Sequence, residues 1–209
     1  MVDAMDFHIG RLMDYLKSID EYENTVFIFT SDNGAASSPL LDSDGNSVLK
    51  NWFDRVGYNT DYESLGEKGS WVAIGPGNAS IANSPLLYYK FHANEGGLRV
   101  PTLISGPGIE PGSECHVPIV QWDLLATFHD LSGSQAPLPE NNDGGSLRDV
   151  FEKGNTGTVE RAAPGIIHHY TCHYHPPISS IVIGDYKLMK HHLMQYIILQ
   201  ILSIKFSLV

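Results

Sequence analysis

The feature that most constrains this chain is a continuous β-branched and aromatic run, Thr25 to Thr30, that ends in the polar sequence Ser31-Asp32-Asn33-Gly34. Such a run is typical of a strand that is buried on both faces of a sheet. Upstream, apolar residues recur at steps of three and four, which predicts an amphipathic helix ending near Ser18. A helix followed by a buried strand predicts an α/β fold, in which ligands bind at the carboxyl ends of strands.

Later segments continue the alternation of helices and strands. Residues 35–94 are irregular and rich in Gly, Asn, Ser and Tyr, and a connection of this length usually carries function. Apolar patterning predicts a second strand over residues 100–105 and a helix over residues 119–131. Two strand-like runs flank Gly184-Asp185, which predicts a β-hairpin over residues 178–190.

Charge and hydropathy exclude some classes of function. The chain has 13 Lys and Arg against 24 Asp and Glu, a formal net charge of −11, which disfavours nucleic acid as a partner. A small anion remains a possible ligand, because a bound cation can reverse the local field. The sequence contains no apolar stretch long enough to span a membrane and no signal-peptide pattern at its first residues.

The Asp32-Asn33 pair offers a carboxylate and an amide oxygen side by side. Both are hard ligands that suit Ca²⁺ or Mg²⁺. By itself an Asp-Asn-Gly sequence is more often a turn that only reverses the chain. A second segment favours a metal-binding pair over a simple turn. It runs from Lys90 to Pro101 and has the sequence Lys-Phe-His-Ala-Asn-Glu-Gly-Gly-Leu-Arg-Val-Pro.

Taken together, these two motifs resemble the sulfatase family, in the arylsulfatase-like branch of the alkaline-phosphatase superfamily. Further matching segments follow in the same order: Gly66-Glu67-Lys68-Gly69-Ser70, Gly75 to Ala79, Asp123 to Thr127 and Gly184 to Leu188. The resemblance implies part of an alkaline-phosphatase-like sheet flanked by helices, with a small C-terminal antiparallel subdomain. We accordingly assign residues 1–160 to the latter half of the catalytic domain, 161–190 to the subdomain and 191–209 to a divergent tail.

The resemblance also implies roles for individual residues. It assigns Asp32 and Asn33 to a divalent cation, calcium with magnesium as the alternative, and Lys90 to binding the substrate's sulfate during catalysis. A cation and a lysine can neutralise the charge on the sulfate oxygens. We expect the Glu95-Gly96-Gly97 sequence to be architectural, with glycines allowing close backbone approach and Glu95 anchoring the loop. Arg99 is expected to form a structural salt bridge.

One expected element is missing from the sequence. Sulfatases use a formylglycine made from the cysteine of a Cys-x-Pro-x-Arg motif, and neither Cys115 nor Cys172 lies in such a motif. The resemblance therefore predicts a sulfuric ester hydrolase that acts on a sulfate-ester small molecule or sulfated glycan, with its nucleophile outside these residues. It also suggests a secreted, periplasmic or lysosomal protein.

Three alternatives stay open. The first is a phosphodiesterase or phosphonate hydrolase of the same superfamily, because a metal and a lysine also suit phosphate. The second is a non-catalytic remnant that binds anions. The third is a zinc site built from the histidine-rich run His168, His169, Cys172, His173 and His175, although Pro176-Pro177 favours a loop there over a compact ligand set.

Overall fold

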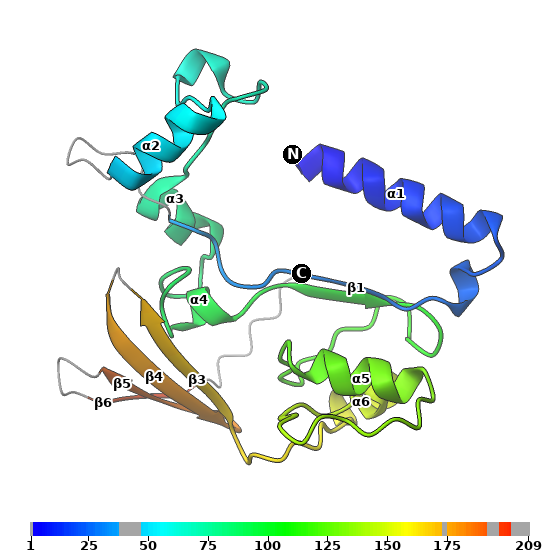
Figure 1. Ribbon diagram of the computed structural model, residues 1–209. Helices are drawn as coiled ribbons and strands as arrows, with labels where there is room; N and C mark the ends of the chain where they lie inside the picture. The colour runs from blue at the N-terminus through cyan, green and yellow to red at the C-terminus, as the bar shows by residue number, and fades with distance from the viewer. Residues whose placement is uncertain (1, 38–46, 173–174, 192–196, 202–209) are drawn as a thin grey trace. The chain divides into compact units, whose positions relative to one another are not determined.

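The computed structural model describes residues 2–37, 47–172, 175–191 and 197–201, and these form two compact units (Figure 1). Unit 1 spans Met1–Thr30 and Pro101–Pro164, and unit 2 spans Ser31–Val100 and Gly165–Val209. The chain therefore passes from unit 1 to unit 2 directly before the Asp32-Asn33 pair.

Unit 1 combines helices with a two-stranded antiparallel ribbon. Its elements in chain order are α1 (Val2–Ser18), the 3-10 helix η1 (Tyr22–Asn24), β1 (Phe27–Thr30), β2 (Thr102–Ser105), α5 (Asp123–Leu131), α6 (Arg148–Lys153) and the 3-10 helix η3 (Gly154–Thr156). The ribbon pairs Phe27 with Ser105 and Thr30 with Thr102. The predicted helix near the start of the chain, the second strand and the helix near residue 125 are confirmed.

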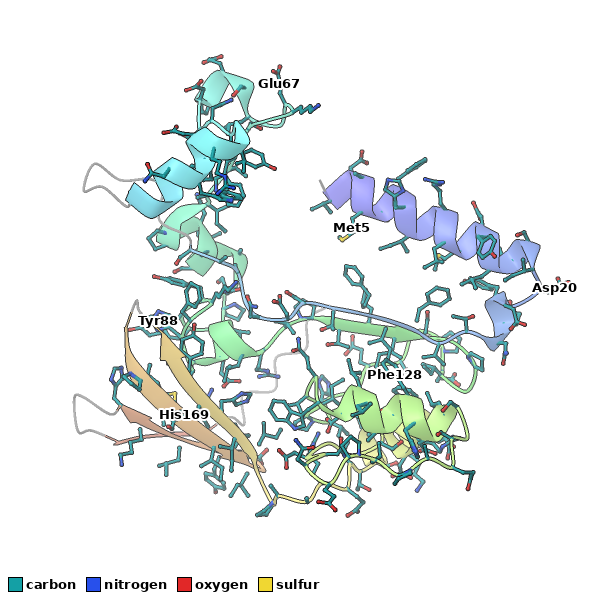
Figure 2. All side chains as sticks on the ribbon, viewed as in Figure 1. Met5, Asp20, Glu67, Tyr88, Phe128 and His169 are labelled. Atoms are coloured by element: carbon teal, nitrogen blue, oxygen red, sulfur yellow. The ribbon has the colours of Figure 1, made fainter. Side chains whose placement is uncertain are left out.

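The prediction that the first strand is buried on both faces is wrong for the described residues. Phe29 in β1 is 46% exposed, and Leu103 in β2 is 67% exposed. Within the described chain β1 pairs only with β2, and a two-stranded ribbon cannot cover both of its own faces. Helix α1 likewise buries none of its residues, so its apolar stripe, which includes the labelled Met5, stays accessible (Figure 2).

The interior of unit 1 is organised by a buried carboxylate. Asp123, at the start of α5, has no exposed surface. Its Oδ1 and Oδ2 accept hydrogen bonds from Arg161 Nε at 2.9 Å and Arg161 Nη2 at 2.6 Å, a bidentate pair. The backbone N–H groups of Gly145 and Val120 donate to the same two oxygens. This carboxylate therefore joins α5 to three separate loop segments.

Unit 2 combines short helices with a four-stranded antiparallel sheet in the order β3-β4-β5-β6 (Figure 1). Its elements in chain order are α2 (Ser47–Val56), the 3-10 helix η2 (Tyr62–Ser64), α3 (Gly75–Ala82), α4 (Glu95–Leu98), β3 (Ile166–Cys172), β4 (His175–Ile183), β5 (Tyr186–His191) and β6 (Ile197–Ile201). The sheet includes the predicted hairpin, in which Ile183 pairs with Tyr186. Gly184 adopts φ 54°, which a glycine tolerates without strain.

Strand β6 lies inside the segment that the sequence suggested to be a divergent tail. Its five residues pair with β5, from Tyr186 opposite Ile201 to Lys190 opposite Ile197. This part of the tail thus extends the antiparallel sheet. In the described chain, no helix combines the length and the apolar character that crossing a membrane requires.

Candidate functional site

The two oxygen ligands predicted for a metal lie in a short polar turn at the start of unit 2. The hydroxyl of Ser31 donates to the carbonyl oxygen of Asn33 over 2.9 Å, which closes the turn. Asp32 is exposed, Asn33 is half-buried and Gly34 is buried. The turn therefore presents its carboxylate to solvent while its glycine packs into unit 2.

Backbone hydrogen bonds bring this turn beside the Lys90 segment. The N–H of Lys90 donates to the carbonyl of Ala35 over 3.0 Å, and the N–H of Gly34 donates to the carbonyl of Gly97 over 3.1 Å. Lys90 is thus hydrogen-bonded to Ala35, two residues after Asn33, although 57 positions separate Lys90 from Asn33 in sequence (90 − 33). The structure brings the backbones of the predicted cation-binding and sulfate-binding residues together.

A side chain that the sequence did not single out supports the same junction. The amide of Asn83 accepts a hydrogen bond from the N–H of Ala35 at 3.1 Å and donates to the carbonyl of Tyr88 at 3.2 Å. It therefore bridges the two candidate segments. An asparagine near a helix end is usually explained by local turn bonding, so its sequence position gave no indication of a contact 48 residues away.

The Lys90 segment has an unusual backbone. Tyr88, labelled in Figure 2, and Phe91 adopt φ values of 64° and 77°, in the left-handed region that residues other than glycine rarely occupy. Each such residue stores about 1–2 kcal/mol of strain. Lys90 itself is half-buried, with its Nζ 5.3 Å from the centroid of the Phe91 ring. Strain on both sides of a charged residue is typical of functional segments whose shape is imposed by their surroundings.

Close backbone packing explains the three glycines of the site. A Cβ on Gly34 would lie 1.8 Å from the carbonyl oxygen of Gly96. A Cβ on Gly96 would lie 2.0 Å from the carbonyl oxygen of Tyr88, and one on Gly97 would lie 2.1 Å from that of His92. These distances exclude any side chain, so the architectural role predicted for the two α4 glycines is confirmed.

We expect Gly96→Ala to lower the free energy of unfolding of unit 2 by about 3 kcal/mol or more, because backbone atoms cannot move aside as a flexible side chain can. Urea unfolding followed by the fluorescence of Trp52 and Trp71, which both lie in unit 2, measures the loss. Gly77→Ala is the matched control, since a Cβ on Gly77 in α3 meets no atom within 4 Å. Equal stability of the two variants would contradict the packing argument.

Glu95 is the anchor of helix α4. Its Oε1 lies 2.6 Å from Nζ of Lys187 in β5, and its Oε2 lies 3.7 Å from Nε of Arg99. Lys187 has no exposed surface, and Glu95 is 8% exposed. The predicted anchoring by Glu95 and the predicted salt bridge of Arg99 are both confirmed. Lys187 belongs to a matching sequence segment, but its sequence position gave no indication of this pairing.

Both members of this ion pair affect the electrostatics of His168 in β3. Burial lowers the pKa of its imidazole below the ordinary value, the positive charge of Lys187 lowers it further, and Glu95 opposes the shift. Among the described residues, no group of three or more His, Cys, Asp or Glu side chains could hold a metal ion. His173 and the side chains of Cys172 and His175 lie outside the described residues, so the zinc alternative stays untested.

The lowered pKa of His168 predicts a pH-dependent stability. Below about pH 6.5 the unfolded chain binds this proton more readily than the folded chain, so the free energy of unfolding falls as the pH falls toward the folded-state pKa. Above that pH both states are neutral and the loss is absent. His168→Gln should reduce the difference in unfolding free energy between about pH 7.5 and about pH 5.5. The neighbouring His169→Gln keeps His168 and is the control; the same slope in both variants would refute the assignment.

A cavity of about 470 Å³ lies in unit 1, where its lining includes Ala126, Asp130, Ser146 and Glu160. None of its lining residues is a predicted site residue. The candidate site is therefore defined by the contacts of its two segments and not by this cavity.

Sequence comparisons support the interpretation of these segments. The sequence model of the Sulfatase family matches residues 1–134. An uncharacterized sulfatase of Schizosaccharomyces pombe is 34% identical over 169 residues, which are 80% of this chain and 28% of that protein. An arylsulfatase of Klebsiella aerogenes is 32% identical over 135 residues, which are 64% of this chain and 28% of that protein.

Solved structures support the fold. A 2-O GAG sulfatase has a TM-score of 0.54 and 16% identity, with 93% of this chain and 33% of that chain covered. A phosphonate monoester hydrolase of Silicibacter pomeroyi has a TM-score of 0.56 and 18% identity, with 96% of this chain and 33% of that chain covered. Both likenesses bear on the fold alone, and they confirm the predicted fold class. The chain spans about a quarter to a third of the length of the proteins that it matches here.

Proposed function

Because the chain belongs to the sulfatase family, we propose that its Asp32-Asn33 turn and Lys90 form the cation-binding and sulfate-binding part of a sulfuric ester hydrolase site. The observation that carries this proposal is the pair of backbone hydrogen bonds, Lys90 to Ala35 and Gly34 to Gly97, that holds the two segments together. The substrate class is a sulfate ester, of a small molecule or of a sulfated glycan.

The donor atoms of the turn fit a hard divalent cation in kind. Asp32 supplies carboxylate oxygens and Asn33 an amide oxygen, the ligand types that Ca²⁺ and Mg²⁺ prefer. They do not fill a coordination sphere of about six to eight oxygens, so water or other groups complete it. A cation bound there supplies positive charge against the sulfate oxygens.

Lys90 contributes a compact positive charge and three N–H donors. Its partial burial reduces solvent screening, so its attraction for a sulfate oxygen is stronger than that of a fully exposed lysine. In this proposal the residues of the chain bind and orient the sulfate, and none of them is the nucleophile. Phosphate has a similar shape and charge, but the two relatives compared above are both named as sulfatases.

Titration of the chain with sodium sulfate in the presence of calcium, followed by calorimetry, tests the proposal. A charge-assisted hydrogen bond contributes about 1.5–3 kcal/mol, so Lys90→Met should weaken sulfate binding by roughly 10- to 100-fold. Lys68→Met removes the same charge from an exposed position of the same unit and should leave the dissociation constant unchanged.

Two results would decide against the proposal. Equal weakening by the Lys90 and Lys68 substitutions would mean that sulfate binds through net charge alone. Tighter binding of methylphosphonate than of sulfate would favour the phosphonate hydrolase alternative.

We also expect calcium to bind this chain weakly, with a dissociation constant on the order of 10⁻³ M or higher, because its two ligand residues leave most coordination positions to water. Asp32→Ala should abolish the binding that remains. Calorimetric titration with calcium chloride measures both, with Asp61→Ala, an exposed aspartate of unit 2, as the control. Tight calcium binding that survives Asp32→Ala would refute this cation site.

A further inference from the structure

The candidate site segment contacts the C-terminal sheet of unit 2 at three places. Glu95 forms its ion pair with Lys187 in β5. Ala93 forms a buried apolar cluster with Ile178 of β4 and Met189 of β5. The remaining contact joins the rings of Phe91 and Tyr170 of β3, whose centroids are 6.1 Å apart. The contacts begin one residue after Lys90 and involve three neighbouring strands.

The inward face of β5 is unusual in carrying a lysine. Burial alternates along the strand, with Lys187 and Met189 buried and Tyr186, Leu188 and Lys190 exposed. The opposite register would bury Tyr186, Leu188 and Lys190 and expose Lys187 and Met189. It would also turn one lysine inward but would bury more apolar surface, so hydrophobic burial alone would favour it. A buried charge is tolerated only with a partner, and Glu95 is that partner. The pair therefore selects which face of the strand meets helix α4.

The residues that follow Glu95 in helix α4 are hydrogen-bonded to both candidate segments. The next residue, Gly96, donates its N–H to the carbonyl of Leu87 over 2.9 Å, at the start of the strained segment. Gly97 accepts the hydrogen bond from Gly34 that holds the Asp32-Asn33 turn. Helix α4 is four residues long, so a displacement of Glu95 moves both attachment points.

We propose that Lys187 is a positioning residue for the sulfate site: through Glu95 and helix α4, it fixes the Lys90 segment against the Asp32-Asn33 turn. The C-terminal sheet then acts as the platform that holds a strained binding segment in its working shape. The catalytic meaning of this inference rests on the proposed function, whereas the mechanical coupling does not.

The test separates positioning from stability. Lys187→Met leaves Glu95 buried without its main partner, whereas the double variant Glu95→Gln/Lys187→Met removes both charges and avoids that penalty. Each is compared with wild type and with Lys190→Met, which removes an exposed lysine from the same strand. The readouts are the sulfate dissociation constant, the urea midpoint of unit 2 and amide hydrogen exchange at Gly34, Lys90 and Gly96.

We expect the double variant to recover most of the urea midpoint that Lys187→Met loses. Sulfate binding should nevertheless stay at least about tenfold weaker than in wild type. Exchange at the three amides should stay at least about tenfold faster, while exchange in the β4–β5 ladder returns to wild-type rates. Lys190→Met should match wild type in every readout.

Recovery of sulfate affinity and amide protection together with the midpoint would overturn the inference, because the pair would then be only a stabilising contact. Failure of the proposed function has a different signature, since sulfate binding would then be insensitive to Lys90→Met in the wild-type background. The exchange rates at Lys90 and Gly34 still decide the coupling in that case. If Lys187→Met does not fold, the double variant alone gives the same comparison.

Discussion

The 209-residue chain is expected to release no aryl alcohol from a generic aryl sulfate, even with calcium present. The proposed site would supply charge and orientation, but the covalent route that the resemblance implies requires a nucleophile that splits hydrolysis into two easier steps. Cys115 is followed by His-Val-Pro and Cys172 by His-Tyr-His-Pro, so neither has the sequence that becomes formylglycine. A colorimetric assay with purified chain, after mass spectrometry has shown both cysteines unconverted, measures the rate.

The control for that assay is Lys90→Met, prepared and assayed in parallel. Wild type and variant should both stay at the buffer rate. Hydrolysis by wild type above the variant would show that these residues contain a nucleophile, and the assignment of this chain to binding and orientation alone would have to be abandoned.

Asp123→Ala should lower the free energy of unfolding of unit 1 by about 3–5 kcal/mol, the range seen when one partner of a buried ion pair is removed. The substitution leaves the Arg161 guanidinium, whose side chain is 14% exposed, without its carboxylate. It also removes the acceptor for the N–H groups of Val120 and Gly145. Urea unfolding followed by Trp122 fluorescence, in a background with Trp52 and Trp71 changed to Phe, reports on unit 1 alone.

The matched control is Asp130→Ala, which removes an exposed pair whose Arg148 Nε to Asp130 Oδ1 distance is 3.0 Å. Surface pairs contribute about 0–1 kcal/mol, although the hydrogen bonds from Arg148 and Ser146 lower the pKa of Asp130. The two losses should therefore differ severalfold. Comparable losses would mean that the Asp123 carboxylate does not organise the interior of unit 1.

Local patterns predicted the regular elements well. The spacing of apolar residues in α1, the apolar run of β2 and the Gly184-Asp185 turn each depend on neighbours in sequence, and each element is observed. Burial was harder to predict, because whether β1 is covered depends on its neighbouring strands and not on its own composition. Strand β3 was also missed, since the histidine-rich run before Pro176-Pro177 was interpreted as a loop.

The same difference, between features set by neighbours in sequence and features set by tertiary contacts, applies to the candidate site. The motifs marked Asp32, Asn33 and Lys90 and the architectural glycines, because residue type and order are visible in sequence. Lys187 could not be recognised, since 92 positions separate it from Glu95 in sequence and a lysine in a strand normally faces water. Asn83 was missed for the same reason. Residues that hold a site in place have ordinary sequences, and only the fold shows what they contact.

A crystal structure of the chain with calcium and sulfate tests the central claim most directly. We expect a cation within about 2.3–2.6 Å of oxygens from Asp32 and Asn33. We also expect a sulfate oxygen about 3 Å from the Nζ of Lys90, with the lysine side chain facing that cation. A Lys90 side chain directed away from the Asp32-Asn33 turn, with both ions bound elsewhere, would contradict it.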